Sequence, residues 1–395
     1  MNILFLAGSL QDAQAGAAHH SVELINALAS RPNIRVTVFL TAPTKRLDPA
    51  TQTTVYRWPA PLPALWRIEE LWEVRRLAAE LRRHSVPSVD VCYTRNTALG
   101  LAFHSIAPNV PIVSHIGSVV ASRETIEETQ KDRAGSWQTR FKARISDWYE
   151  KQSYGRARWL HLVSTPIVGK IREEVHKLPP GFFHVLPLGA SVKRFDRSRQ
   201  YDDVRASLGI SGDAQVLLTV ARLVRWKNID LVIRSLRRLD SDKCYLIVVG
   251  GGPELESLRR LAIDSGVANR THFVGQIPEP APYYAASDVF VLPSQIESFG
   301  NVYAEAMLMG LPCIGMRHRP PEILSSAEDV IPEGVAGYCV DGEPELVDRL
   351  NQLVGNRALS RKLGENAYDH ARRNYTIERY TESLLGLVRS HFGIV

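Results

Sequence analysis

Short apolar runs alternate with segments of helical periodicity along this chain, and the alternation starts twice. The first series opens with the apolar run at residues 3–6, and a loop with Gly8 and Gly16 and a helical pattern from Val22 to Leu28 follow it. Three further apolar runs lie at residues 36–40, 89–93 and 112–114. Strands covered by helices on both faces read as continuous apolar runs, and alternating strands and helices are typical of a parallel sheet. The first half of the chain is therefore predicted to form a parallel α/β domain.

The same alternation begins again in the second half of the chain. Strand-like apolar runs lie at residues 215–220, 245–249, 271–274, 288–292 and 312–315, and residues 358–392 carry a mostly helical pattern. A length of 395 residues exceeds what one hydrophobic core usually organises. The sequence therefore predicts an α/β protein with two Rossmann-like, doubly wound domains. We expect an N-terminal domain over residues 1–190, a second domain over residues 191–371 and a C-terminal helix over residues 372–395 that packs back on the first domain.

The net positive charge of the chain comes from its first half. Residues 1–190 hold 23 basic and 16 acidic residues, a net charge of +7, and the remaining residues hold 25 and 26, a net charge of −1. A basic surface suits nucleic acid, an anionic lipid surface or an anionic substrate, and charge alone does not separate these partners.

Other sequence signals indicate the compartment. The four cysteines are scattered without a Cys-x-x-Cys pair, so no metal site or disulfide framework is predicted. The first residues lack the basic segment and cleavage site of a secretory leader. The longest stretch without charged residues, residues 96–122, contains two prolines and two histidines and is interpreted as helix, turn and buried strand rather than a membrane span. A cytoplasmic protein is expected.

The richest motif lies at residues 293–312. Glu297 falls in a loop after a strand, and Glu305 falls in the first two turns of a helix that begins near Gly300. The unpaired N–H groups and positive dipole end at a helix N-terminus suit a phosphate, and the glutamates could accept hydrogen bonds from hydroxyl groups. The segment therefore predicts a site for a ligand with phosphate and sugar; the alternative is two surface glutamates of no special function.

A second motif joins a strand end to a helix start at residues 220–228. It holds Arg222 and Lys227, two fixed cations on one loop. Arg222 can bind phosphate oxygens through its planar guanidinium and Lys227 can act as a point charge, which suits a diphosphate held without a metal. Standing alone, these residues could equally be solvated surface cations.

Taken together, residues 217–227, 248–254, 273–275 and 293–312 resemble, in order and spacing, the C-terminal domain of retaining glycosyltransferases of family 4. The glutamate pair with the intervening Ser-Phe-Gly at residues 298–300 is the most specific part. The resemblance implies the GT-B fold of the glycogen-phosphorylase-like superfamily, in which two Rossmann-like domains face a cleft and a C-terminal helix crosses between them. It also implies a hexosyltransferase that moves a sugar from a UDP- or GDP-sugar to a hydroxyl acceptor in polysaccharide or glycolipid biosynthesis, with no metal or cofactor required.

The family's functional residues carry over by position. Arg222 and Lys227 would bind the donor diphosphate, Glu305 the ribose hydroxyls and Glu297 the donor sugar. The implied donor site comprises Gly16, Arg222, Lys227, Gln276, Ile277, Glu297, Phe299, Gly300, Asn301 and Glu305, and the implied catalytic residues are Glu297, Arg222, Lys227 and His115.

The sequence departs from the family pattern at four places. Gly16 stands between alanines where two adjacent glycines are common, and Ala221 replaces the glycine before the arginine. The Pro-Asn-Gly-Val-Asp segment at the domain join reads Pro-Leu-Gly-Ala-Ser at residues 187–191, and the expected His-Gly becomes His115-Ile116-Gly117. His115 is a candidate for contacting the sugar or acceptor; the alternative is a structural histidine at a strand end. The departures affect the acceptor side more than the donor side.

The implied reaction breaks the bond between an anomeric carbon and a diphosphate. Negative charge grows on the leaving phosphate, and the two cations and the helix N-terminus would stabilise it. In such a family the acceptor hydroxyl attacks from the face that the diphosphate leaves. Glu297 as a glycosidase-like nucleophile is the alternative, but the sequence places no second acid for that mechanism.

The expected partners are the nucleotide sugar and a glycan or lipid-linked acceptor, with no nucleic acid. An anionic membrane at the inner face is a further candidate, because an aromatic and basic stretch combines membrane-type residues with a helical pattern: Arg57, Trp58, Trp66, Arg67, Trp72, Arg75, Arg76, Arg82 and Arg83. Two other functions stay open, a nucleotide-sugar epimerase and a non-catalytic nucleotide-sugar-binding protein, because fold alone does not choose among them.

Overall fold

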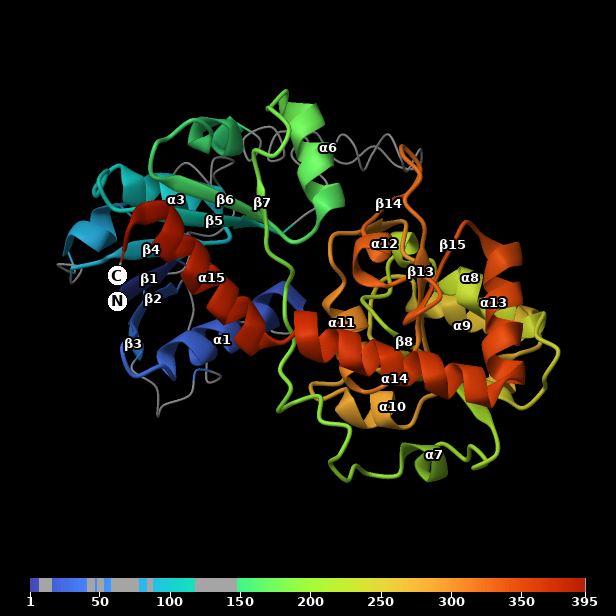
Figure 1. Ribbon diagram of the computed structural model, residues 1–395. Coiled ribbons are helices and arrows are strands. Elements are labelled where there is room, and N and C mark those ends of the chain that lie inside the picture. The colour runs from blue at the N-terminus through green and yellow to red at the C-terminus, as the bar shows by residue number, and fades with distance from the viewer. Residues whose placement is uncertain are drawn as a thin grey trace. The chain divides into compact units, whose positions relative to one another are not determined.

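The computed structural model describes residues 1–6, 16–40, 47, 53–57, 78–83, 88–117 and 148–394. The chain divides into two compact units: the first is Met1–Leu188 with Ile377–Val395, and the second is Gly189–Thr376. Each unit is built on its own parallel sheet (Figure 1). The sequence predicts boundaries after residues 190 and 371, and the chain passes between the units after residues 188 and 376.

The sheet of the first unit has seven parallel strands in the order β3-β2-β1-β4-β5-β6-β7. The order reverses between β1 and β4, which is the doubly wound arrangement. The strands are β1 (Asn2–Leu6), β2 (Arg35–Leu40), β3 (Thr53–Arg57), β4 (Val91–Thr94), β5 (Ile112–Ile116), β6 (Trp159–Val163) and β7 (His184–Val185).

Helices pack on both faces of this sheet, because successive side chains of a strand point to opposite faces. On one face a core cluster joins Leu4 and Cys92 to α3 (Thr97–His104). On the other face Ile3 and Val113 share a small cavity with Leu384 of α15 (Ile377–Phe392), which also packs on α1 (Gly16–Ala29). The C-terminal helix is thus part of the first unit, and α6 (Pro166–His176) packs against β6 and β7.

The sheet of the second unit has six parallel strands in the order β10-β9-β8-β11-β13-β15. Here the order reverses between β8 and β11. The strands are β8 (Gln215–Val220), β9 (Cys244–Val249), β10 (Thr271–Gly275), β11 (Val289–Leu292), β13 (Cys313–Met316) and β15 (Gly337–Val340), and a separate pair is formed by β12 (Ile296–Glu297) and β14 (Leu324–Ser325).

Helices surround the second sheet in two groups. The first packs α8 (Ile229–Arg237) with α9 (Leu255–Asp264) and α13 (Glu343–Gly355). The second packs α11 (Asn301–Leu308) on α14 (Arg357–Asn374), where a Cβ atom at Gly364 would lie 2.1 Å from the carbonyl oxygen of Gly310. Shorter helices are α7 (Val204–Ser207), α10 (Ala281–Ala285) and α12 (Ala327–Val330).

The predicted fold class is confirmed: both units are parallel, doubly wound α/β sheets. The uncharged stretch that begins at residue 96 forms α3, a turn and β5 in its described part. In the described ranges no helix combines the length and the hydropathy needed to cross a bilayer. The prediction missed β3, β6, β7, β12, β14 and β15, which are short or contain polar residues such as His161.

Candidate active site

The two motifs found in the sequence follow the two strands at which the second sheet reverses its order. Residues 221–228 leave the carboxyl end of β8, and residues 293–300 leave the carboxyl end of β11. These strands are neighbours and parallel. Ligands of doubly wound folds bind outside the carboxyl ends of the strands at such a reversal, so the topology alone brings the two motifs together.

The loop after β8 is held by the glycine run after β9. Leu223 N–H donates to the carbonyl of Gly251 at 2.9 Å, and Glu254 N–H donates to the carbonyl of Leu223 at 3.1 Å. A Cβ atom at Gly250 would lie 1.8 Å from the carbonyl oxygen of Ala221. These glycines therefore let one backbone segment pass against another, which leaves Arg222 on an anchored loop with its side chain exposed.

Two hydrogen bonds tie this loop to the loop after β11. The N–H of Gln295 donates to the carbonyl of Trp226 at 2.8 Å, and the side chain of Asn228 donates to the carbonyl of Pro293 at 2.9 Å. Asn228 has a left-handed backbone conformation, φ 52°, and is the N-cap residue that precedes α8. The cationic loop and the glutamate loop thus form one connected surface.

Lys227 and Glu297 meet at this connection. Lys227 Nζ lies 2.6 Å from Glu297 Oε2, and their side chains are 17% and 13% exposed. A pair with so little solvent around it has a stronger electrostatic interaction than a surface pair, at the cost of desolvation. Lys227 keeps two further N–H donors for another acceptor, so the pair forms a positioned cation beside a positioned carboxylate.

The turn that leads into α11 requires a glycine at its N-cap position. Gly300 has φ 73°, and a Cβ atom there would lie 2.6 Å from the ring of Tyr303 and 3.2 Å from Glu297 Cγ. The N-cap position is Gly300, which has no side chain to cap the helix. The Phe299 ring is buried and packs edge-on against Tyr375. The Phe299 side chain is therefore used in packing, and α11 begins at Asn301.

Glu305 is fixed by a residue that sequence reasoning missed. The hydroxyl of Tyr284, from α10, donates to Glu305 Oε2 at 2.9 Å. Burial and the neighbouring Glu305 raise the pKa of Tyr284 well above its ordinary value, so the hydroxyl stays a donor. Two adjacent tyrosines precede β11 in the sequence, and nothing in the pattern distinguishes the one that reaches Glu305.

The two residues expected near the base lie after β10. The Gln276 side chain is exposed and runs along Gly251, where an added Cβ atom would lie 3.1 Å from Gln276 Cγ. Ile277 is half-buried. The structure therefore puts Gln276 against the glycine run that anchors the Arg222 loop.

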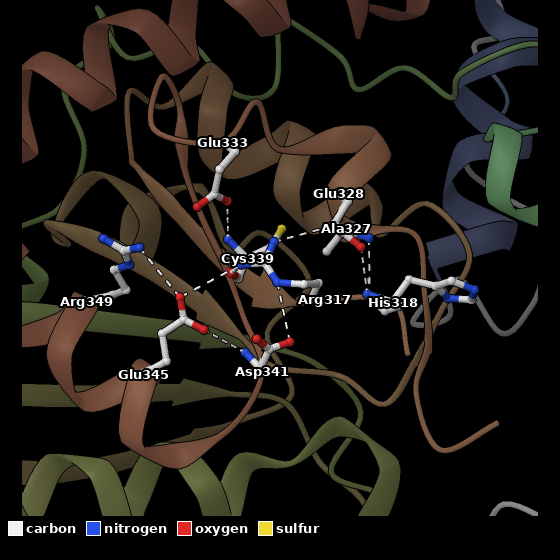
Figure 2. A network of polar contacts seen from close by, with 10 residues as sticks. Arg317, His318, Ala327, Glu328, Glu333, Cys339, Asp341, Glu345 and Arg349 are labelled. Carbon is white, nitrogen blue, oxygen red and sulfur yellow. Dashed lines mark hydrogen bonds and ion pairs between the residues drawn. The ribbon is translucent and has the colours of Figure 1, made fainter. Parts of the chain in front are cut away.

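A polar network braces the carboxyl ends of β13 and β15 (Figure 2). Arg317 lies 3.4 Å from both Glu328 and Asp341 and 3.8 Å from Glu345, and it donates to the carbonyl of Cys339. The segment that follows Arg317 leads into β14, whose Leu324 N–H donates to the carbonyl of Gln295 at 2.7 Å and which pairs with β12. The network thus supports the strand that carries Glu297.

His115 lies in the first unit, within β5, and is fully buried. Its Nδ1 lies 2.6 Å from the hydroxyl of Tyr380 in α15 and 3.3 Å from the hydroxyl of Tyr93 in β4. Burial first, and the charge of Arg95 second, lower the pKa of His115 well below its ordinary value. His115 is therefore a neutral imidazole held by two tyrosines that sequence reasoning did not find. Tyr380 is 265 residues away from His115 in the chain, so no local pattern connects the two residues.

Some predictions fall outside the described residues. Gly16 is the first residue of α1, but the loop before it, residues 7–15, is not described. Of the proposed membrane-contact stretch at residues 57–83, only residues 57 and 78–83 are described, so its tryptophans lie outside the description. Within the described segments, no group of three or more His, Cys, Asp or Glu side chains is arranged to hold a metal ion.

Comparison with solved structures identifies the fold. The Anabaena protein HepE in complex with UDP and glucose is 20% identical, with a TM-score of 0.76 over 99% of this chain and 100% of that one. WaaG, a glycosyltransferase involved in lipopolysaccharide biosynthesis, is 18% identical, with a TM-score of 0.74 over 98% of this chain and 99% of that one. With its two doubly wound units, the chain has the GT-B fold.

Family models identify the two halves of the chain. Residues 15–194 match the model described as Glycosyltransferase Family 4, and residues 200–370 match the model described as Glycosyl transferases group 1. The chain belongs to the family-4 glycosyltransferases, as the resemblance predicts.

Curated relatives match about half of the chain. The lipopolysaccharide core biosynthesis glycosyltransferase LpsE of Rhizobium meliloti is 32% identical over 188 residues, covering 47% of this chain and 53% of that protein. A GDP-mannose-dependent alpha-(1-6)-phosphatidylinositol monomannoside mannosyltransferase of Mycolicibacterium smegmatis is 34% identical over 194 residues, covering 45% and 47%. The chain thus spans about half the length of the curated relatives that it matches.

Proposed function

We propose that this protein is a retaining glycosyltransferase that moves a sugar from a nucleoside-diphosphate sugar to a hydroxyl acceptor. The observation that carries the proposal is the Lys227–Glu297 pair, 2.6 Å apart, beside the start of α11 at Gly300 and at the reversal point of the second sheet. A cation for a phosphate, a carboxylate for sugar hydroxyls and a helix start for an anion lie there within one connected surface. The second unit is the proposed donor domain, and the first is the proposed acceptor domain.

The proposed chemistry follows from these residues. As the bond to the anomeric carbon breaks, negative charge grows on the leaving diphosphate, and Arg222, Lys227 and the N–H groups at the start of α11 stabilise it. Lys227, whose side chain is 17% exposed, contributes more there than it would in bulk water. Because these groups supply the positive charge, we propose that transfer needs no metal ion. Glu297 orients the sugar, Glu305 accepts from the ribose hydroxyls, and the acceptor attacks from the face that the diphosphate leaves.

Relatives support the choice of substrate class. HepE is described in complex with UDP-glucose, LpsE in lipopolysaccharide core biosynthesis and the mycobacterial relative as dependent on GDP-mannose. We propose a UDP- or GDP-sugar as donor, with Gln276 and Ile277 beside the base, and a glycan or a lipid-linked glycan as acceptor. The place of action is then the cytoplasmic face of a membrane that holds the acceptor.

A panel of UDP- and GDP-sugars tests the proposal through two readouts, nucleotide release and product analysis. We expect one donor to raise the melting temperature, since a ligand that binds only the folded state stabilises it. We also expect slow release of its nucleotide in the presence of EDTA, with the anomeric configuration of the donor retained in the product. Binding without nucleotide release would identify a sensor, and interconversion of donor sugars would identify an epimerase; either result would overturn the proposal.

The membrane part of the proposal has its own experiment. The protein is mixed at low salt with vesicles that contain anionic lipid and with vesicles that do not. Co-flotation with the anionic vesicles alone is expected, because attraction of a basic surface to anionic lipid is electrostatic and screened by salt. Absence of the protein from both vesicle fractions would remove the membrane from the proposal and leave the transferase activity in place.

A further inference from the structure

A buried chain of hydroxyl groups joins the C-terminal helix to His115. The hydroxyls of Tyr93 and Tyr380 lie 2.9 Å apart, and that of Tyr380 lies 2.6 Å from His115 Nδ1. All three side chains are buried, and the Tyr380 ring stacks on the imidazole with 5.9 Å between ring centroids. Most buried residues of α15 near Tyr380, such as Leu384, Leu385 and Val388, are apolar.

The direction of these hydrogen bonds follows from acidity. A phenol is a stronger acid than a neutral imidazole N–H, and an imidazole nitrogen is a stronger base than a phenol oxygen. The arrangement that pairs the stronger acid with the stronger base has the Tyr380 hydroxyl donating to His115 Nδ1. The Tyr93 hydroxyl then donates to the Tyr380 oxygen. Burial raises the pKa of both tyrosines, so both hydroxyls stay protonated. The hydrogen bond at one ring nitrogen decides which nitrogen of a neutral histidine carries the proton, so the proton of His115 lies on Nε2.

The other ring nitrogen of His115 points to a missing acceptor. His115 Nε2 is buried and has no hydrogen-bond partner among the described residues. A buried donor left without a partner destabilises the folded state. A ligand or a bound water can supply the acceptor, and His115 is the second-last residue of β5, at the carboxyl end where ligands of doubly wound folds bind.

We propose that Tyr380, supported by Tyr93, is a positioning residue that holds His115 as the neutral Nε2–H form, ready to donate to an oxygen of the transferred sugar or of the acceptor. The proposal rests on the proposed glycosyltransferase function for its substrate. It assigns to the C-terminal helix a role in the active site that its position in the sequence does not suggest. Tyr380 acts through His115 and does not itself touch substrate.

Helix α15 provides a matched control. Thr381, the next residue, is fully buried, and its hydroxyl donates to the carbonyl of Ile377 in the same helix at 2.6 Å. Thr381→Val therefore removes a buried hydroxyl from the same helix without affecting His115. Tyr380→Phe keeps the ring and removes only the hydroxyl, and Tyr93→Phe removes the outer hydroxyl of the chain.

The direct test is nitrogen NMR of the full-length protein with ¹⁵N-labelled histidine, with His115 assigned from His115→Gln. In the wild type we expect Nδ1 to resonate as an unprotonated, hydrogen-bonded nitrogen and Nε2 as a protonated one. Tyr380→Phe should shift the Nδ1 resonance strongly, Tyr93→Phe less, and Thr381→Val not at all. A proton on Nδ1 in the wild type, or an unchanged resonance in Tyr380→Phe, would overturn the assignment. If Tyr380→Phe does not fold, the Tyr93→Phe shift decides.

Kinetics separates this inference from the proposed function. With the donor that the panel of nucleotide sugars selects, Tyr380→Phe should lower kcat/KM about tenfold, the effect of one lost hydrogen bond. His115→Gln should lower kcat/KM at least as much. Thr381→Val should keep wild-type kinetics. If the NMR shifts follow the expectation and His115→Gln turns over normally, the hydrogen-bond geometry stands but His115 has no role in transfer, and the positioning proposal is wrong. If no variant and no donor gives turnover, the proposed function fails while the NMR result still decides the tautomer.

Discussion

Lys227 and Glu297 are separated by 70 residues and form an ion pair with one another. The sequence assigns them to different parts of a donor, the lysine to the diphosphate and the glutamate to the sugar. Their direct contact means that each is positioned by the other before any ligand arrives. Preorganisation of this kind lowers the free energy needed to reorient the catalytic groups during the reaction.

Glu297→Gln tests the role of the carboxylate. The amide keeps the size of the side chain but removes its charge, so Lys227 loses its ionic partner. We expect donor binding within severalfold of the wild type and a fall in turnover of about a hundredfold or more, as for other preorganised electrostatic groups. Isothermal titration and initial rates measure the two effects. Unchanged turnover would eliminate Glu297 from the mechanism.

Tyr284→Phe tests whether Glu305 must be held. Without the hydroxyl, Glu305 loses a charge-assisted hydrogen bond, and the donor should bind about tenfold more weakly with little change in kcat. Donor titration and KM measure the effect. The neighbouring Tyr283→Phe is the control, because Tyr283 does not reach Glu305 in the described structure. Equal donor affinity in all three proteins would show that Tyr284 is only a packing residue.

At the level of elements, the loop after β8 depends on the glycine run after β9. The Arg222 side chain is exposed, but Leu223 and Val224 beside it are buried, and the loop backbone is hydrogen-bonded to residues 249–254 along one side. The two loops are therefore coupled through their backbones, and a substitution in the glycine run is expected to displace Arg222 and Lys227.

Gly250→Ala tests that dependence. Gly250 has φ 140°, and a Cβ atom would collide with the Ala221 carbonyl, so we expect a loss of about 1–3 kcal/mol of stability together with weaker donor binding. Gly212→Ala is the matched control, since an added Cβ atom there meets nothing within 4 Å. Denaturant unfolding and donor titration give the two values. A Gly250→Ala protein as stable and as tight in donor binding as the control would contradict the interpretation.

At the scale of the whole molecule, buried histidines connect the stability of the first unit to pH. Burial lowers the pKa of His161 to about 4, against 6.5 for an exposed histidine. Burial also lowers the pKa values of His20 and His115 well below that reference. All three groups bind protons more readily in the unfolded chain than in the folded one.

The expected result is a loss of stability as pH falls below about 6.5. Above that pH the three histidines are neutral in both the folded and the unfolded state, and the folded state has its full stability. Below it, the unfolded chain takes up protons that the folded chain does not, so the free energy of unfolding falls. His161 alone should account for about 3 kcal/mol by pH 4. Free energies of unfolding between pH 7.5 and 4 measure the slope. His161→Phe, which keeps an aromatic ring beside Phe182 and Trp159, should flatten it, and an identical slope in that variant would contradict the assignment.

Much of this protein could be predicted from the order of its residues. The alternation of apolar runs gave the two parallel sheets, because a strand buried on both faces must be apolar along its length. The motifs at 222–227 and 297–305 fell after strands that become neighbours, because the chain order of a doubly wound sheet fixes where it reverses. Chain-local signals were sufficient for these features.

The tertiary structure alone decided which side chains meet. Tyr284 reaches Glu305, Lys227 reaches Glu297 and Tyr380 reaches His115 across separations of 21, 70 and 265 residues. Such contacts leave no periodic pattern in the sequence, because they depend on how the helices and loops pack against the folded sheets. The sequence determined the two sheets and the loops that bear the chemistry; packing of α10, α11 and α15 determined the partners that orient it.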